Sequence, residues 1–265
     1  MTKRGRKGQL TIFIILAILI VAIVLFIFLF WPKLSTTTSE TRNPYAFMTT
    51  CIGDHIEDTI ETIILQGGTM NLDEDTSFSY QGENIRFLCH TNVYYEHTCH
   101  RQVAFLLPSI QNEIQENIEL EIEECFGALK RSYEEEGYTV NVKEIGDFGV
   151  KIIPQGILIK LGSDLMLNKG NTAEEYRDFA IKQKSGLYTI LEVAENIITI
   201  EQELGYCDTS VYSLLYSEID ITKLANQDNS HYDDVQLYTL VHRETEEEFK
   251  FAIRSLAYPP VPNGF

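Results

Sequence analysis

The longest apolar run of the chain covers residues 10–31, LTIFIILAILIVAIVLFIFLFW. Eighteen of these 22 residues are Leu, Ile, Val or Phe, and none is charged. As an α-helix rising about 1.5 Å per residue, the run would measure roughly 33 Å, enough to cross a hydrocarbon core of about 30 Å. It therefore predicts a transmembrane helix over 9–31 that contacts a lipid bilayer from Leu10 to Trp31. A signal peptide removed after the run is the alternative, but WPKLSTTT offers no small-residue cleavage pattern.

Basic residues flank this run unequally. Four of them precede it, whereas only Lys33 and Arg42 follow closely. The positive-inside rule then places the N-terminus in the cytoplasm and residues 32–265 outside the cell. The predicted organisation is a basic leader (1–8), the transmembrane helix (9–31), a polar linker (32–43), an acidic ectodomain (44–258) and a flexible tail (259–265).

The remaining apolar residues recur at helical spacing in three segments and alternate in several shorter ones. Helices are predicted over 51–65, from 108 to a glycine at 127 or 137, and over 186–204. A short helix or turn is expected around 210–216, and 172–184 is ambiguous between strand and helix. The predicted fold class is α+β, with an ectodomain of about three helices and a mostly antiparallel sheet. Its strands are expected within 78–93 and at 138–142, 149–154, 156–161, 164–168, 218–224, 235–242 and 248–257.

Charge changes this picture mainly by excluding partners. The chain carries 21 Lys and Arg against 39 Asp and Glu, a formal net charge of −18. Such a charge repels nucleic acid and the anionic faces of membranes, so we expect no nucleic-acid partner. It is typical of a protein kept soluble outside the cell; cation binding is the less favoured interpretation.

Five cysteines allow two disulfides and leave one thiol over. We expect Cys89–Cys99 to close a local loop and Cys51–Cys125 to join the start of one predicted helix to the next. An extracytoplasmic location would permit both bonds. Cys207 is then either buried and inert or available to a partner.

Histidines cluster around one of these predicted bonds. His90, His97 and His100 lie beside Cys89 and Cys99, which makes this the densest group of metal-capable side chains. Zinc would need thiolates and neutral imidazoles in a tetrahedron, and a disulfide would consume both sulfurs. A disulfide is the favoured interpretation, with a zinc or copper site or free thiols as alternatives, and no cofactor is predicted.

Residues 6–20, RKGQLTIFIILAILI, resemble the class III leader of archaeal type IV pilin-like proteins. The resemblance implies cleavage between Gly8 and Gln9, just before the apolar run. Members often begin the mature chain Q-x-S-x-E; Gln9 fits, Thr11 stands for the serine, and Phe13 replaces the acid that guides assembly. An ordinary uncleaved signal-anchor is the alternative. The ectodomain also resembles uncharacterised membrane-anchored archaeal proteins, in which a similar leader precedes a helix ending Q-G-G, as at 66–68.

Recognisable catalytic motifs are missing from the sequence: it contains no G-x-S-x-G, H-E-x-x-H or G-x4-G-K-[ST]. This favours a non-catalytic protein. We expect a single-pass surface protein with a structural, adhesive or pilin-like role, through self-association or contact with other surface proteins. The alternative is a membrane-tethered enzyme or ligand-binding module whose site lies in a cleft of the ectodomain. A deep polar pocket would favour the alternative, whereas an exposed sheet edge or apolar patch would favour association.

Overall fold

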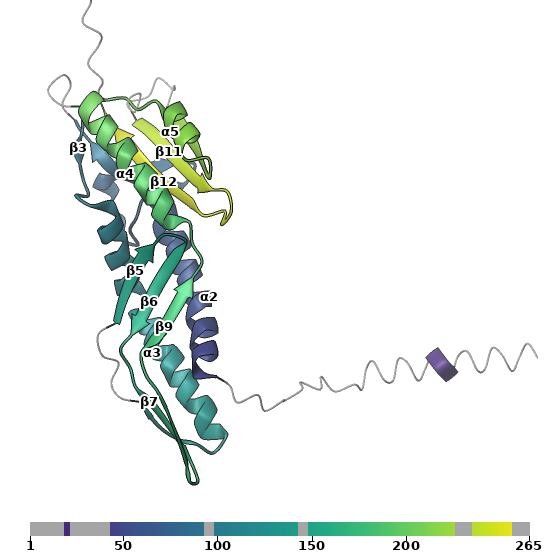
Figure 1. Cartoon of the computed structure of the whole chain (residues 1–265). Coiled ribbons are helices and arrows are strands. Elements are labelled where there is room, and N and C mark those ends of the chain that lie inside the picture. The colour runs from purple at the N-terminus through teal and green to yellow at the C-terminus, as the bar shows by residue number, and fades with distance from the viewer. Residues whose placement is uncertain (1–18, 22–42, 93–97, 143–147, 226–234, 256–265) are drawn as a thin grey trace, which may run out of the picture. The chain divides into compact units, whose positions relative to one another are not determined.

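The computed structural model describes residues 19–21, 43–92, 98–142, 148–225 and 235–255 (Figure 1). The chain divides into two compact units, Met1–Asn43 and Pro44–Phe265. The predicted leader with Gly8 and Gln9, nearly all of the linker and the tail lie outside the described residues. Pilin-type processing therefore stays a prediction.

The predicted fold class is wrong in its first element. Within 9–31 the structure describes only Leu19–Val21, a helical piece that rises about 4.5 Å. Among the described residues no helix combines the length and the apolar composition needed to cross a bilayer. The fold class is therefore corrected to α+β, carried by Pro44–Phe265.

Helices in this second unit match the predicted segments and extend them. The 108–137 segment becomes one helix of 30 residues, about 45 Å long, and the turn expected near 210 is a fourth α-helix. The described helices are α2 (Pro44–Leu65), η1 (Glu74–Thr76), α3 (Leu106–Glu135), α4 (Leu187–Leu204) and α5 (Thr209–Leu215).

Strands form three separate sheets where the sequence predicted one, and the ambiguous segment 172–184 is two strands. All pairs are antiparallel except β2 with β12. The large sheet has the order β1-β2-β12-β11-β10, with β3 also on β2, and the small ones are β4-β7-β8 and β5-β6-β9. The strands are β1 (Ser77–Tyr80), β2 (Glu83–His90), β3 (His100–Arg101), β4 (Thr139–Val142), β5 (Phe148–Ile153), β6 (Gly156–Leu161), β7 (Leu165–Lys169), β8 (Thr172–Tyr176), β9 (Phe179–Gln183), β10 (Ile219–Ala225), β11 (Val235–His242) and β12 (Glu248–Arg254).

Helix α3 is the element against which much of the rest packs. Its isoleucines at every fourth position, from Ile110 to Ile122, form a stripe that is at most 1 % exposed. This stripe meets α2 and small-sheet strands β4 and β5, while α4 lies across the large sheet (Figure 1). The glycines after α2 permit a close approach: a Cβ on Gly68 would lie 2.9 Å from the Ile110 side chain, and its φ of +93° suits glycine.

Side chains of α3 also satisfy the backbone of an edge strand. Gln111 Oε1 accepts a hydrogen bond from Ile152 N at 2.9 Å, and Gln115 Oε1 accepts one from Val150 N at 3.2 Å. Both N–H groups belong to β5, at the end of its sheet. An exposed edge would otherwise be a template for pairing with other chains, so these glutamines block it.

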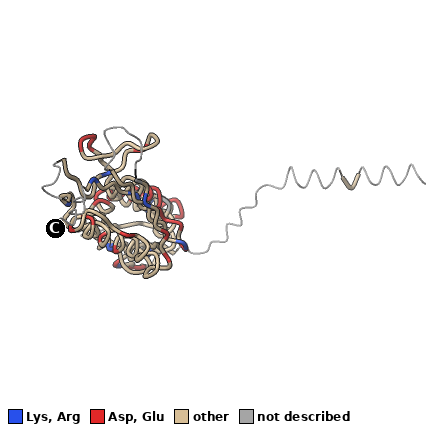
Figure 2. The backbone as a smooth tube through the Cα atoms, turned by 90° about the horizontal axis from the view of Figure 1, so that it is seen from above, with Lys and Arg blue, Asp and Glu red and all other residues tan. Residues whose placement is uncertain are grey.

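Acidic residues dominate the surface of the second unit. Residues 44–265 contain 15 Lys and Arg against 38 Asp and Glu, a net charge of −23. Figure 2 shows Asp and Glu recurring around the backbone, with fewer Lys and Arg between them. Any surface free of charge is therefore exceptional in this domain.

Candidate functional site

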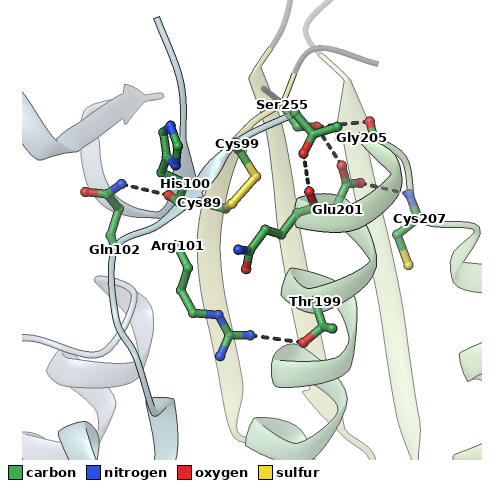
Figure 3. The surroundings of a disulfide bond; sticks show 12 residues. Cys89, Cys99, His100, Arg101, Gln102, Thr199, Glu201, Gly205, Cys207 and Ser255 are labelled. Carbon is green, nitrogen blue, oxygen red and sulfur yellow. Dashed lines mark hydrogen bonds between the residues drawn. A yellow bond between two sulfur atoms is a disulfide. The ribbon is translucent and has the colours of Figure 1, made fainter. Parts of the chain in front are cut away.

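Two disulfides are present in the second unit, and they join the expected cysteines. Cys51 on α2 is bonded to Cys125 on α3, with Cα atoms 5.9 Å apart. Cys89 on β2 is bonded to Cys99, with Cα atoms 5.5 Å apart, next to α4 (Figure 3). The fifth cysteine, Cys207, is a buried free thiol. Disulfides of this kind are typical of oxidising compartments.

The predicted histidine cluster is only partly described. His90 and His100 lie directly opposite each other in the β2–β3 pair, whereas His97 lies outside the described residues. The His90 ring centroid lies 4.7 Å from that of Phe87, and burial together with the charge of Arg254 lowers the pKa of His90. The neighbouring sulfurs are bonded to each other. A zinc or copper site here stays a prediction.

A carboxylate that the sequence analysis did not single out is buried at the end of α4. Glu201 has no exposed surface. Its Oε1 accepts hydrogen bonds from the Tyr238 hydroxyl, from Lys223 Nζ at 3.1 Å and from Cys207 N at 3.0 Å. Its Oε2 accepts one from Ser255 Oγ at 2.7 Å (Figure 3). Glu201 thus joins α4 to β10, β11 and the segment after β12.

These hydrogen bonds fit a structural role for Glu201 better than a catalytic one. Burial, with the nearby charge of Glu201, raises the pKa of the Tyr238 hydroxyl. Burial also raises the pKa of the Cys207 thiol to about 11, so the thiol is protonated and unreactive at neutral pH. Both oxygens of Glu201 already accept protein hydrogen bonds, and the side chain has no exposed surface where a substrate could approach it.

A polar cavity of about 490 Å³ opens beside the start of α4. Its lining includes Lys182 and Lys184 from the end of β9 and the segment after it, Thr189 from α4, and His242 from the end of β11. Gly186 is needed in this wall because a Cβ there would lie 2.3 Å from Cγ of His242. The cavity is a candidate for the cleft expected of a ligand-binding module.

The polar groups around this cavity are bonded to one another. Ser185 Oγ donates to Glu247 Oε1 at 2.6 Å, and Thr245 Oγ1 donates to Glu247 Oε2 at 2.6 Å. The backbone N–H of Thr245 donates to His242 Nδ1 at 3.2 Å. Because Ser185 gives its hydrogen to a carboxylate, these residues do not form the serine–histidine pair of a nucleophilic enzyme.

Exposed apolar side chains lie on α5, the short helix between α4 and β10, and on the chain segments that flank it. None of its seven residues (TSVYSLL) is buried and none is charged, and the most exposed, Leu214, shows 84 % of its surface. Helix α5 contacts β10, an outer strand of the large sheet. Exposed apolar patches of this kind mark contact sites between proteins. We use the name α5 patch for Leu204, Tyr206, Val211, Leu214, Leu215 and Leu224, all of which are exposed.

Comparisons with known proteins found no relative of this chain. No protein-family model matches the chain, and the searches of curated proteins and of solved structures found no match. The function must therefore be argued from the site alone.

Two features of the site carried a sequence signal that we did not use. Glu201 follows Ile197 and Ile198 on the apolar face of α4, and an acid in that register is a candidate buried carboxylate. In α5 the pair Leu214–Leu215 follows Val211 in a stretch free of charge. The exposure of these leucines, by contrast, depends on how α5 lies on the large sheet, and no local sequence pattern predicts that packing.

Proposed function

We propose that this protein is a structural or adhesive component of an extracytoplasmic surface, and that a second copy of the chain binds to its α5 patch. The observation that carries the proposal is the exposure of an uncharged apolar helix on a strongly acidic domain. Two disulfides support the extracytoplasmic location. The cavity beside His242 supports the alternative ligand-binding role less well, because hydrogen bonds within the protein already engage several of its polar groups.

Charge restricts where a second copy of this chain can bind. Two domains that each carry a net charge of −23 repel each other over most approaches. The residues of the α5 patch carry no charge themselves, with the exposed Asp208 and Glu218 at either end of α5. The outer position of β10 allows the two patches to meet around a two-fold axis. Salt screens the remaining repulsion, so association should strengthen as ionic strength rises.

Sedimentation velocity of residues 43–265 over a range of concentrations tests this proposal. We expect a reversible dimer, and Leu214→Glu should weaken it about thirtyfold or more, as expected for a central apolar contact worth about 2 kcal/mol. Leu120→Glu is the matched control, because Leu120 on α3 is 72 % exposed but lies outside the α5 patch. A wild-type monomer at every concentration, or equal effects of the two variants, would overturn the proposal.

A further inference from the structure

A third metal-binding side chain lies beside the disulfide that joins α2 to α3. One ligand atom each from Cys51, His55 and Cys125 lies within 4.8 Å of the other two. His55 follows Cys51 by one helical turn, so the two side chains share a face of α2. His55 is exposed and Cys51 half-buried, which gives solvent access to the group.

Glu121 of α3 lies one helical turn from Cys125, outside the three-residue group, and a change of its rotamer would bring a carboxylate oxygen toward that group. Helices α2 and α3 are antiparallel, since Cys51 meets Cys125 while Gly68, beyond the far end of α2, meets Ile110. The turn of α2 that carries His55 is therefore level with the turn of α3 that carries Glu121. Glu121 Oε2 is buried, and within the described part of the chain it has no hydrogen-bond partner.

Apolar contacts also hold this helix pair together. Ile52 and Ile56 of α2 and Ile118 and Ile122 of α3 are at most 1 % exposed and belong to the main hydrophobic core. Breaking the S–S bond would leave these contacts in place. The two thiols would stay close together, which preorganises them to bind a common ligand.

We propose that the reduced form of this site binds Zn²⁺ through Cys51, Cys125 and His55, with Glu121 as the fourth ligand. A dithiol or phosphine supplies the two electrons of the reduction: the S–S bond breaks and each sulfur takes one proton. Binding of Zn²⁺ then releases both protons, because thiolates are the ligands. Two thiolates, one imidazole and one carboxylate form a set that suits tetrahedral zinc. The cation would keep α2 joined to α3 when the disulfide is open.

The second disulfide provides a control inside the same molecule. Cys89 and Cys99 are both at most 3 % exposed. Among the described residues, the only group of three or more close metal ligands is the one with His55. Because the metal site predicted at Cys89 and Cys99 would also respond to reduction, variants of each cysteine pair are needed to separate the two sites.

Cobalt absorption of the purified full chain tests the proposal. The chain is reduced with a phosphine under argon, freed of reductant and titrated with Co²⁺ and then with Zn²⁺. We expect one tetrahedral Co²⁺ per chain with thiolate charge-transfer absorption, its displacement by Zn²⁺, and no such spectrum from the oxidised chain. His55→Ala, which keeps the disulfide and changes an exposed side chain, should lower the affinity more than about tenfold.

Matched variants decide which residues bind the metal. Cys89→Ser/Cys99→Ser should keep the cobalt spectrum, and Cys51→Ser/Cys125→Ser should lose it. A reduced wild type without a tetrahedral spectrum, or unchanged affinity in His55→Ala, would overturn the site. Unchanged affinity in Glu121→Gln would overturn the assignment of the fourth ligand. The outcome is independent of association through the α5 patch.

Discussion

Glu201 is the single residue on which we expect the large sheet to depend most. Replacing it with Ala would remove the buried carboxylate that accepts hydrogen bonds from the Lys223 ammonium, the Tyr238 hydroxyl and the Ser255 hydroxyl. Removing one partner of a buried charge pair costs about 3–5 kcal/mol, and we expect Glu201→Ala to lower the free energy of unfolding by that amount. Urea denaturation followed by circular dichroism measures the change.

Glu203 provides the control for this prediction, because it lies on the same helix and is exposed. Glu203→Ala should change the free energy of unfolding by no more than about 0.5 kcal/mol. If both variants unfolded at the urea concentration of the wild type, Glu201 would not have the stabilising role assigned to it here.

At the level of single residues, sequence reasoning worked where chemistry limits the choices. The five cysteines allow fifteen arrangements of two disulfides, and the structure contains the arrangement that was favoured. It failed for Glu201, whose partners come from β10, β11 and the segment after β12. Only the folded sheet brings those donors together, so no spacing in the sequence predicts them.

At the level of elements, the two disulfides should differ in their contribution to stability. Cys51–Cys125 closes a loop of 74 residues and Cys89–Cys99 one of 10. From the chain entropy that each closed loop removes from the unfolded state, the long-loop disulfide should add about 4.5 kcal/mol to the free energy of unfolding and the short-loop disulfide about 2.7 kcal/mol. We therefore expect Cys51→Ser/Cys125→Ser to unfold at a lower urea concentration than Cys89→Ser/Cys99→Ser. The reverse order would show that local packing around β2 and β3 outweighs loop length.

Helices were easier to predict than sheets in this chain. The apolar stripe of α3 repeats every fourth residue, so its period alone defines the helix. Strand β8 (TAEEY) buries no side chain and shows no such period, which is why 172–184 remained ambiguous. The parallel pairing of β2 with β12 joins distant parts of the sequence. A pairing of that kind follows from the assembled core and has no local signal.

At the level of the whole molecule, the described residues that form the hydrophobic core all come from the second unit. The main cluster runs from Met48 to Ile253, and both disulfides lie between the same limits. Residues 44–265 should therefore fold alone when produced in an oxidising compartment. We expect one cooperative thermal transition, with a midpoint within about 2 °C of the full chain in the same detergent buffer, a difference of less than about 1 kcal/mol.

A fragment that begins at residue 66 is the control: without α2 it lacks Cys51 and the isoleucines that cover α3, so it should not unfold cooperatively. A much lower midpoint for 44–265 than for the full chain would mean that the first unit stabilises the second through contacts outside the described residues.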